Sequence, residues 1–368
     1  MPLLWLPLLV ASLWNVAGLV AVVRTTRRRA PAGLRAPAVS VLKPLCGCDA
    51  DLSGNLESFF QQDHPDFELV FGAVDENDPA LPVARALAAR YPNVRCRVVT
   101  HPGGKALNPK IDNLMGLLPE ARHDLLLVSD SNVRAPVHML QEMAVLYATE
   151  RAGLVTHLFA GVGENSLGAA LENVELCGFT AAGVALPTAL GDALVVGKSM
   201  LFSRQRLEEL GGFERLADVL AEDFVLGKTF AHAGARVIVA PTVLSNVTRD
   251  MSLRGMAARH LRWSMLRFRL RPVAAALEPL TSPLALLPLA WWLMGPWALL
   301  WASTLLALRD GGGWLALRGR KRWYLPLVLS PLRELTALVV WAIAPIKQHV
   351  SWRGKRYRLG AGTLLYPE

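Results

Sequence analysis

Three acidic residues lie next to hydrophobic stretches, in positions where a carboxylate could do chemistry. Asp75 ends the run FELVFGAVD, Asp130 ends DLLLVSD, and Asp223 stands in AEDF at the start of a helical pattern. A carboxylate at the end of a strand can hold Mg²⁺ or Mn²⁺ against a diphosphate. A carboxylate beside a hydroxyl can remove its proton. Together the acids predict a site that binds a metal-bound nucleotide-sugar and activates a hydroxyl.

Each acid has a role in this interpretation and an ordinary structural alternative. Asp75 would accept hydrogen bonds from a base or ribose, Asp130 would bind the metal, and Asp223 would be the general base, with Glu222 as its fallback. The alternative for Asp75 and Asp130 is a turn, because Asp, Asn, Ser and Pro favour turns. The alternative for Glu222 and Asp223 is the general preference for acids at helix N-termini.

A basic-aromatic group follows the acids. Arg259, Arg262 and Trp263 are spaced i, i+3, i+4, so they share one face of a helix. Two guanidinium groups can bind phosphate oxygens, and an indole can stack on a sugar or line an acceptor pocket. The alternative is a basic helix that binds anionic lipid. Lys110, in GGKALNPK, suits either a nucleotide phosphate or a surface turn.

Alternating strand and helix patterns position these residues. Residues 36–250 read as repeated strand-helix units, which predict an α/β catalytic domain with a mostly parallel, covered sheet. Ligands of such sheets bind beyond the carboxyl ends of the strands, where Asp75 and Asp130 fall.

Composition indicates a membrane protein with a soluble middle. The 368 residues are 52% hydrophobic, with a mean hydropathy of +0.31 and a net charge of +9. The basic residues gather beside the hydrophobic segments, which favours a membrane surface over nucleic acid as the partner. The four cysteines lack metal-ligand spacing, so we expect free thiols in a reducing compartment. The pattern gives no oligomeric state.

The hydrophobic ends predict membrane segments. Residues 1–24 are expected to be an uncleaved transmembrane anchor, because its positive charges follow the apolar run and place the middle domain in the cytosol. Residues 251–272 read as an amphipathic interface helix, and 273–368 as a C-terminal membrane region with a basic tail. Within it, Leu280–Leu308 is long enough for two short legs that turn at Gly295-Pro296. Leu325–Ile346 carries a central Arg-Glu pair and either lies at the interface or buries that pair against protein.

Nine stretches of the chain together resemble the ceramide glucosyltransferases. They run in that family's order from Val39 almost to the C-terminus: VSVLKPL, NLESFFQQDHP, VDENDPA, ARYPNV, NPKIDNLM, DSNVR, AEDF, RHLRW and SWRGKRYRL. The most discriminating are NPKIDNLM and SWRGKRYRL. In this chain RxxRW replaces the alternative form QxxRW.

The resemblance implies a glycosyltransferase A-type fold and an inverting, Mg²⁺- or Mn²⁺-dependent transfer from a UDP-sugar to a lipid hydroxyl. Asp75, Lys110, Asp130 and the RxxRW residues would bind the donor, with Asp223 as the base. Glucose and ceramide are the expected sugar and acceptor. The Ala- and Arg-rich composition is typical of a high-GC bacterial gene, so we expect a bacterial inner membrane, with the catalytic domain cytosolic. The alternatives are a UDP-N-acetylglucosamine-dependent hopanoid or other lipid glycosyltransferase, a processive polysaccharide synthase, and a non-catalytic membrane protein that binds lipid.

Overall fold

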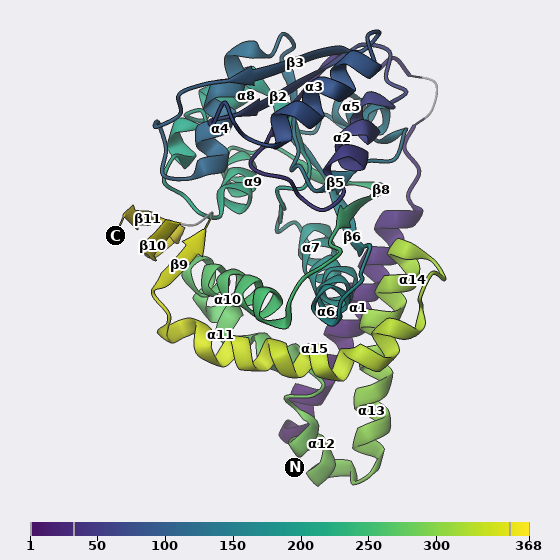
Figure 1. Ribbon diagram of the computed structural model, residues 1–368. Helices are drawn as coiled ribbons and strands as arrows, with labels where there is room; N and C mark the ends of the chain where they lie inside the picture. The colour runs from purple at the N-terminus through teal and green to yellow at the C-terminus, as the bar shows by residue number, and fades with distance from the viewer. Residues whose placement is uncertain (1, 32–33, 353–354, 368) are drawn as a thin grey trace.

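A mixed eight-stranded sheet forms the centre of the upper domain in the computed structural model, which describes residues 2–31, 34–352 and 355–367 (Figure 1). Its strand order is β3-β2-β1-β4-β7-β6-β8-β5. The strands are β1 (Val39–Pro44), β2 (Phe67–Ala73), β3 (Arg95–Thr100), β4 (Leu125–Val128), β5 (Val133–Arg134), β6 (Leu154–Val162), β7 (Met200–Ser203) and β8 (Val237–Val247). The sheet pairs in parallel from β3 to β4 and between β6 and β8, whereas β7 and β5 run antiparallel to their neighbours. The predicted, mostly parallel sheet is confirmed.

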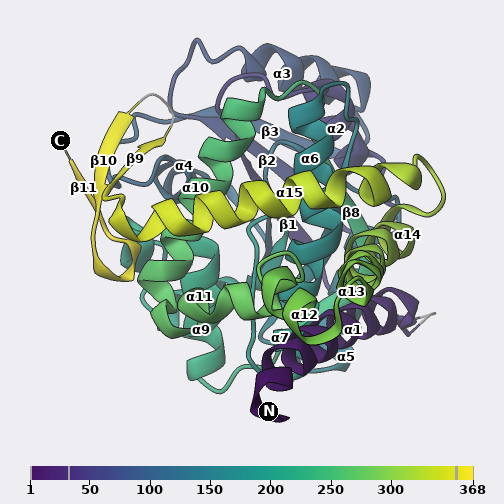
Figure 2. The ribbon, with the colours of Figure 1, turned by 90° about the horizontal axis from the view of Figure 1, so that it is seen from below.

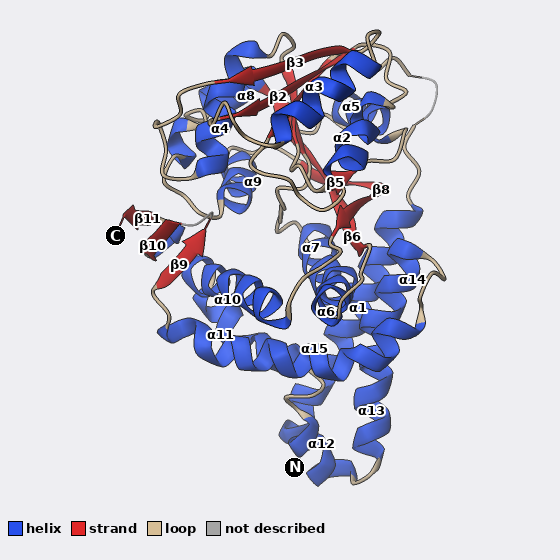
Figure 3. Ribbon diagram, viewed as in Figure 1, coloured by secondary structure: helices blue, strands red, loops and turns tan. Residues whose placement is uncertain are grey.

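Helices cover both faces of this sheet (Figure 3). One face packs against α2 (Leu52–Phe60), α3 (Ala80–Arg90) and α5 (Met139–Thr149), and the other against α4 (Pro109–Leu117), α8 (Arg204–Glu209) and α9 (Glu222–His232). Successive residues of β4 alternate between the two hydrophobic cores: Leu125 and Leu127 join the first, Leu126 and Val128 the second. A wholly apolar strand is therefore required here, since each buried side chain contributes roughly 1.5–3 kcal/mol.

Three helices in the described residues are long and apolar enough to cross a membrane: Pro2–Arg27, Leu167–Ala189 and Tyr324–Ile346. The first includes α1 (Leu6–Arg27), the predicted anchor. The second joins α6 (Leu167–Glu175) to α7 (Ala181–Ala189) through the π-helical turn Leu176–Thr180, and it was not expected as a membrane segment. Within this helix, 78% of the 18-residue apolar window is buried inside the protein, so packing within the molecule accounts for its apolar composition.

The stretch Leu280–Leu308 folds as the two short legs that the sequence predicts. They are α12 (Leu287–Met294) and α13 (Trp297–Leu306), which pack against each other. Gly295 ends α12 with φ of 59°, a left-handed conformation that favours glycine. The proline that follows begins the second leg.

The remaining helices form a layer between the catalytic domain and this hairpin. They are α10 (Leu253–Leu270), α11 (Pro272–Leu277), α14 (Gly312–Arg318) and α15 (Tyr324–Ile343). In Figures 1 and 2, α15 crosses the underside of the molecule, whereas α1 and α13 extend downward from it. Large apolar side chains are exposed on this underside: Trp291, Trp292, Trp297, Leu300, Val328, Leu332, Leu335 and Val339. Such a surface is typical of a protein that contacts lipid.

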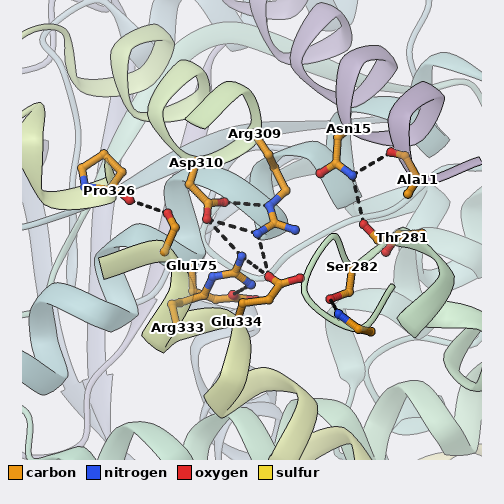
Figure 4. A network of polar contacts seen from close by, with 12 residues as sticks. Ala11, Asn15, Glu175, Thr281, Ser282, Arg309, Asp310, Pro326, Arg333 and Glu334 are labelled. Atoms are coloured by element: carbon orange, nitrogen blue, oxygen red, sulfur yellow. Dashed lines mark hydrogen bonds and ion pairs between the residues drawn. The ribbon is translucent and has the colours of Figure 1, made fainter. Parts of the chain in front are cut away.

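A buried ionic network supplies partners for Arg333 and Glu334, the Arg-Glu pair at the centre of α15 (Figure 4). These partners offset the free energy that burying the two charges costs. Arg333 Nη1 lies 3.0 Å from Glu175 Oε2, and Arg333 Nη2 lies 3.0 Å from Asp310 Oδ2. Arg309 contacts Asp310 at 2.7 Å and Glu334 at 2.7 Å, and Arg333 also pairs with Glu334. The structure thus buries the pair against protein, one of the two predicted solutions, while the opposite face of α15 stays exposed and apolar.

The predicted basic tail is instead folded. Its described residues include a small antiparallel sheet of β9 (His349–Trp352), β10 (Lys355–Leu359) and β11 (Leu365–Pro367). It packs against the catalytic domain, where the Leu365 amide donates to Asp218 and the Leu220 amide donates to Thr363. The sequence pattern missed this because the hydrophobic residues of the tail are short runs among arginines. Arg353, part of that predicted tail, lies outside the described residues.

We expect Arg309→Met to lower the stability of the purified protein by about 3 kcal/mol or more, because Asp310 and Glu334 would stay buried with one guanidinium fewer. Thermal unfolding in detergent, followed by tryptophan fluorescence, measures this. The exposed Arg320 gives the matched control, and Arg320→Met should change stability by less than about 0.5 kcal/mol. Equal effects of the two substitutions would contradict the importance of the network.

Candidate active site

The carboxyl end of β4 is the centre of the candidate site. The apolar run of β4 ends at Val128, and Asp130 follows two residues later. β7 pairs antiparallel with β4, with Met200 opposite Val128, so residues that precede Met200 lie beside residues that follow Val128. This register brings Lys198 next to Asp130, although the two are 68 residues apart in the chain.

Asp130 contacts three lysines. Its Oδ1 lies 2.8 Å from Lys110 Nζ, and its Oδ2 lies 2.9 Å from Lys198 Nζ. Lys43, fully buried in β1, donates from Nζ to the main-chain oxygen of Asp130 at 2.8 Å. Burial alone would raise the pKa of Asp130, but the Lys110 and Lys198 ammonium groups hold it well below its usual range. Asp130 is therefore ionised at neutral pH.

Lys110 joins Asp130 to the acids of α9. Asn108 caps α4 and accepts hydrogen bonds from the Lys110 and Ile111 amides, which fixes the start of the helix that carries Lys110. Lys110 Nζ then reaches Glu222 Oε1 at 3.0 Å as well as Asp130. Burial alone would lower the pKa of Lys110, but the surrounding carboxylates raise it well above its usual value. Lys110 is thus a permanent cation shared between two elements of the fold.

Glu222 and Asp223, adjacent at the start of α9, have different surroundings. Glu222 is buried, and its Oε2 accepts a hydrogen bond from Asn108 Nδ2 at 3.3 Å. Burial raises the pKa of Glu222, Lys110 opposes this rise, and the charge of Asp223 adds to it. Asp223 is half-buried, and its Oδ2 accepts from the Gly197 amide at 2.6 Å. Asp223 is therefore the acid of this pair that a substrate can reach more easily.

Gly197 lies close to two charged side chains of the site. A Cβ atom at this position would lie 2.5 Å from Lys110 Nζ and 3.2 Å from Asp223 Oδ2. A larger residue at position 197 would therefore displace Lys110 Nζ from its place beside Asp130 and Glu222. The sheet edge, α4 and α9 meet at this point.

The folded C-terminus helps to hold the start of α9. Thr363 accepts a hydrogen bond from the Leu220 amide at 2.9 Å through its carbonyl oxygen, and one from the Ala221 amide at 3.3 Å through Oγ1. Thr363 is fully buried and lies only two residues from β11. The segment that leads into Glu222 is therefore fixed by residues more than 140 positions away in the chain.

Asp75 follows β2 and the glycine-rich loop follows β3, at the carboxyl ends of two neighbouring parallel strands. Asp75 is exposed, and its Oδ1 accepts from the Asn77 amide at 2.9 Å, as in the turn that its sequence also allowed. The amides of Gly104 and Lys105 donate to the Asp112 carboxylate at 2.9 and 2.7 Å. These amides are thus bound by an internal acid, which favours a structural role for the loop. The role of Asp75 at the nucleotide stays a prediction.

The RxxRW residues lie on α10, which leads from the catalytic domain toward the membrane-facing layer. Arg259 Nη1 lies 3.0 Å from Glu172 Oε1, and His260 Nε2 lies 2.6 Å from Glu172 Oε2. The fully buried Glu172 thus fastens α10 to α6. Trp263 is half-buried and stacks on His260, with ring centroids 5.6 Å apart, and Arg262 is half-buried on the same helix. Arg259 is therefore a structural anchor here, and the phosphate-binding roles of Arg259 and Arg262 stay predictions.

The residues around Asp130 do not fit a resident divalent cation in this arrangement. Lys198 Nζ lies 2.9 Å from Asp130 Oδ2 and 3.0 Å from Asn132 Oδ1, so an ammonium group already lies between the two oxygens that would bind Mg²⁺ or Mn²⁺. Residues 2–31, 34–352 and 355–367 contain no group of three or more His, Cys, Asp or Glu side chains that could hold a metal ion.

The structure therefore brings together Lys110, Asp130 and Asp223 of the predicted set, with Glu222. It adds Lys43 and Lys198, which the sequence reasoning missed. Both are lysines inside apolar strand-like runs, VSVLKPL and ALVVGKSMLFS, and a charge in such a run was the available signal.

Comparisons with known proteins agree with this architecture. The family described as Glycosyl transferase family 21 matches residues 3–365. Ceramide glucosyltransferase 1 of Caenorhabditis elegans is 29% identical over 245 residues, which cover 66% of this chain and 53% of that protein. The chain thus spans about half the length of that relative. Ceramide glucosyltransferase 3 of the same organism is 26% identical over 357 residues, covering 90% of this chain and 74% of that protein.

A solved structure shares the fold. The mannosyltransferase PcManGT from Pyrobaculum calidifontis, in complex with GDP-Man and Mn²⁺, aligns with a TM-score of 0.53 and 19% identity over 94% of this chain and 98% of that chain. This likeness confirms the predicted glycosyltransferase A-type fold.

We expect Lys110 and Glu222 to be energetically coupled, because Lys110→Met would leave the Glu222 carboxylate buried without its cation. Thermal unfolding of Lys110→Met, Glu222→Gln and the double variant should give a coupling energy of about 1 kcal/mol or more. The exposed pair Arg206 and Glu209 gives a control cycle, for which we expect a coupling of about 0.5 kcal/mol or less. Additive effects at Lys110 and Glu222 would contradict the shared-cation interpretation.

Proposed function

This chain belongs to glycosyl transferase family 21, and we propose that it transfers glucose from UDP-glucose to a hydroxyl of ceramide, with inversion at the sugar. The observation that carries the proposal is the convergence of Lys110, Asp130, Glu222 and Asp223 at the carboxyl end of β4. Ligands of open α/β sheets bind at this edge. The curated relatives named ceramide glucosyltransferases support the choice of sugar and acceptor.

Asp223 is the proposed general base. It stands at the start of α9 with a carboxylate oriented by the Gly197 amide, and it is less buried than Glu222. In the reaction, Asp223 takes the proton from the lipid hydroxyl as that oxygen attacks the anomeric carbon from the side opposite UDP. Glu222 has a positioning role, because its carboxylate holds Lys110.

The departing UDP gains negative charge, which lysines at this edge can stabilise. Lys110 Nζ lies within ion-pair distance of Asp130 and Glu222, and a diphosphate in the same region would meet a preorganised cation. Asp75, after β2, is proposed to bind the uridine part of the donor. Arg262 and Trp263 are proposed to contact the donor or acceptor from α10. Mg²⁺ or Mn²⁺ at Asp130 is the competing arrangement, and the affinity for UDP measured in EDTA and in Mn²⁺ distinguishes the two.

The proposed acceptor is a membrane lipid that approaches from the underside of the molecule. A pocket lies between α10, α15 and the segment that follows α11, and its lining includes Phe179, Trp263, Arg267, Glu278 and Trp341. The pocket is small, about 30 Å³, and its aromatic and charged lining suits the polar head of a lipid. The exposed apolar surface of α12, α13 and α15 supports lipid contact beside this pocket.

The proposed orientation follows from charge. Arg24, Arg27, Arg28 and Arg29 stand at or beyond the end of α1, on the side of the catalytic domain. Positive residues beside a membrane span favour the cytosol, so we propose that the catalytic domain is cytosolic. The Ala- and Arg-rich composition supports the proposal of a bacterial inner membrane.

We expect purified protein in detergent to release UDP from UDP-glucose when ceramide is present, and Asp223→Asn to lower kcat roughly 10²- to 10⁴-fold. Glu222→Gln should retain more activity, because it only positions Lys110. The exposed Asp66 gives a matched control, and Asp66→Asn should behave as wild type. Mass spectrometry of the lipid product identifies the acceptor.

Assays with other donors and acceptors test the assignment of glucose as the sugar and ceramide as the acceptor. Release from UDP-N-acetylglucosamine with a hopanoid, and none from UDP-glucose with ceramide, would overturn the proposed substrates while keeping the transferase. Full activity of Asp223→Asn would overturn the assignment of the base.

A further inference from the structure

Lys198 occupies the position of a bound cation in the site. Its Nζ donates to Asp130 Oδ2 at 2.9 Å and to Asn132 Oδ1 at 3.0 Å. Carboxylate and amide oxygens are the ligand types that Mg²⁺ and Mn²⁺ prefer. The two oxygens belong to one short segment after β4, so a single positive charge between them neutralises the carboxylate in the same place that a metal ion would.

The backbone of Lys198 is fixed independently of its side chain. Ser129 Oγ donates to the Lys198 carbonyl oxygen at 2.9 Å, and the Lys198 amide donates to the Val196 carbonyl at 2.7 Å. The next residues enter β7, whose register against β4 is set by ladder hydrogen bonds. The stem of Lys198 therefore starts from a rigid point, and only its flexible end needs to move when a ligand arrives.

The side chain is also accessible. Lys198 is 17% exposed and Asp130 27% exposed, whereas Lys43 on the other side of Asp130 is completely buried. A diphosphate that approaches the sheet edge can thus reach the Lys198 ammonium, but it cannot reach that of Lys43. Lysine binds phosphate as a mobile point charge with three donors, and turning from Asp130 toward a phosphate oxygen keeps it paired.

We propose that Lys198 is a resident cation for the donor diphosphate, so that the nucleotide binds through Lys198 and Lys110 without a divalent metal. This proposal rests on the proposed function. In the transfer, the bond between the anomeric carbon and the diphosphate oxygen breaks, and the electron pair stays on UDP. The Lys198 ammonium group stabilises that charge, while the acceptor oxygen bonds to the anomeric carbon and its proton goes to Asp223.

The proposal predicts a switch in metal dependence. Lys198→Met keeps the length of the side chain but removes its charge, which leaves the Asp130 and Asn132 oxygens available to a metal ion. We expect wild-type protein to bind UDP equally well in EDTA and in Mn²⁺. Lys198→Met should bind roughly ten- to a hundredfold more weakly in EDTA, because it loses a charge-assisted contact, and Mn²⁺ should restore much of the affinity.

Isothermal titration calorimetry with UDP in detergent measures these affinities without turnover. Lys198→Arg keeps the charge and should retain binding in EDTA, and the exposed Lys347 gives a neutral control in Lys347→Met. Thermal unfolding of each variant shows whether it is folded.

The possible results distinguish failure of the Lys198 proposal from failure of the proposed UDP-sugar function. Binding of UDP by wild type only with Mn²⁺ or Mg²⁺, together with wild-type behaviour of Lys198→Met, would overturn the role of Lys198 and leave the transferase standing. Failure of folded wild type to bind UDP with or without metal would overturn the UDP-sugar function itself.

Discussion

The shared ammonium group of Lys110 is the interaction on which the site depends. It lies between Asp130 after β4 and Glu222 at the start of α9, so it connects the sheet edge to the helix that presents Asp223. Three carboxylates this close would repel one another, and burial would drive protons onto them. The surrounding lysines prevent this at Asp130, whose pKa is lowered, whereas the deeper Glu222 still has a raised pKa. Asp130 is thus ionised and partly accessible, whereas Glu222 serves mainly to hold Lys110.

A second set of ionic contacts ties the catalytic domain to the membrane-facing layer. Glu172 of α6 receives both Arg259 and His260 from α10, and Glu175, one helical turn later, receives Arg333 from α15. The same helix therefore fixes the two elements that border the proposed acceptor pocket. Removing one partner of such a buried pair costs free energy of folding. These contacts therefore hold α10 and α15 in place against α6, between the apolar underside and the reacting groups.

Much of the fold was predictable, because its signals are local. The apolar run of β4, the cap at Asn108 and the acids at the start of α9 each appear within a few residues of sequence. These patterns place Asp130, Lys110 and Asp223 at the ends of their elements. The metal at Asp130 was predicted from that placement and from family resemblance, without knowledge of what would lie opposite.

The rest depends on pairings between distant segments. Lys198 meets Asp130 only because β7 runs antiparallel to β4, which the expectation of a mostly parallel sheet did not provide. Two partners of Arg333 lie far from it in the chain: Glu175 on α6 is 158 residues away, and Asp310 in the turn before α14 is 23 residues away. The support that Thr363 gives to α9 also crosses most of the domain. Such contacts are set by tertiary packing, and neither periodicity nor composition encodes them.

A structure of the UDP complex, determined in the presence of Mn²⁺ with anomalous diffraction data, tests the central claim most directly. The account predicts the Lys110 and Lys198 ammonium groups within hydrogen-bond distance of the diphosphate and no anomalous peak beside Asp130. An Mn²⁺ ion bridging Asp130 and the diphosphate, with Lys198 turned away, would contradict it.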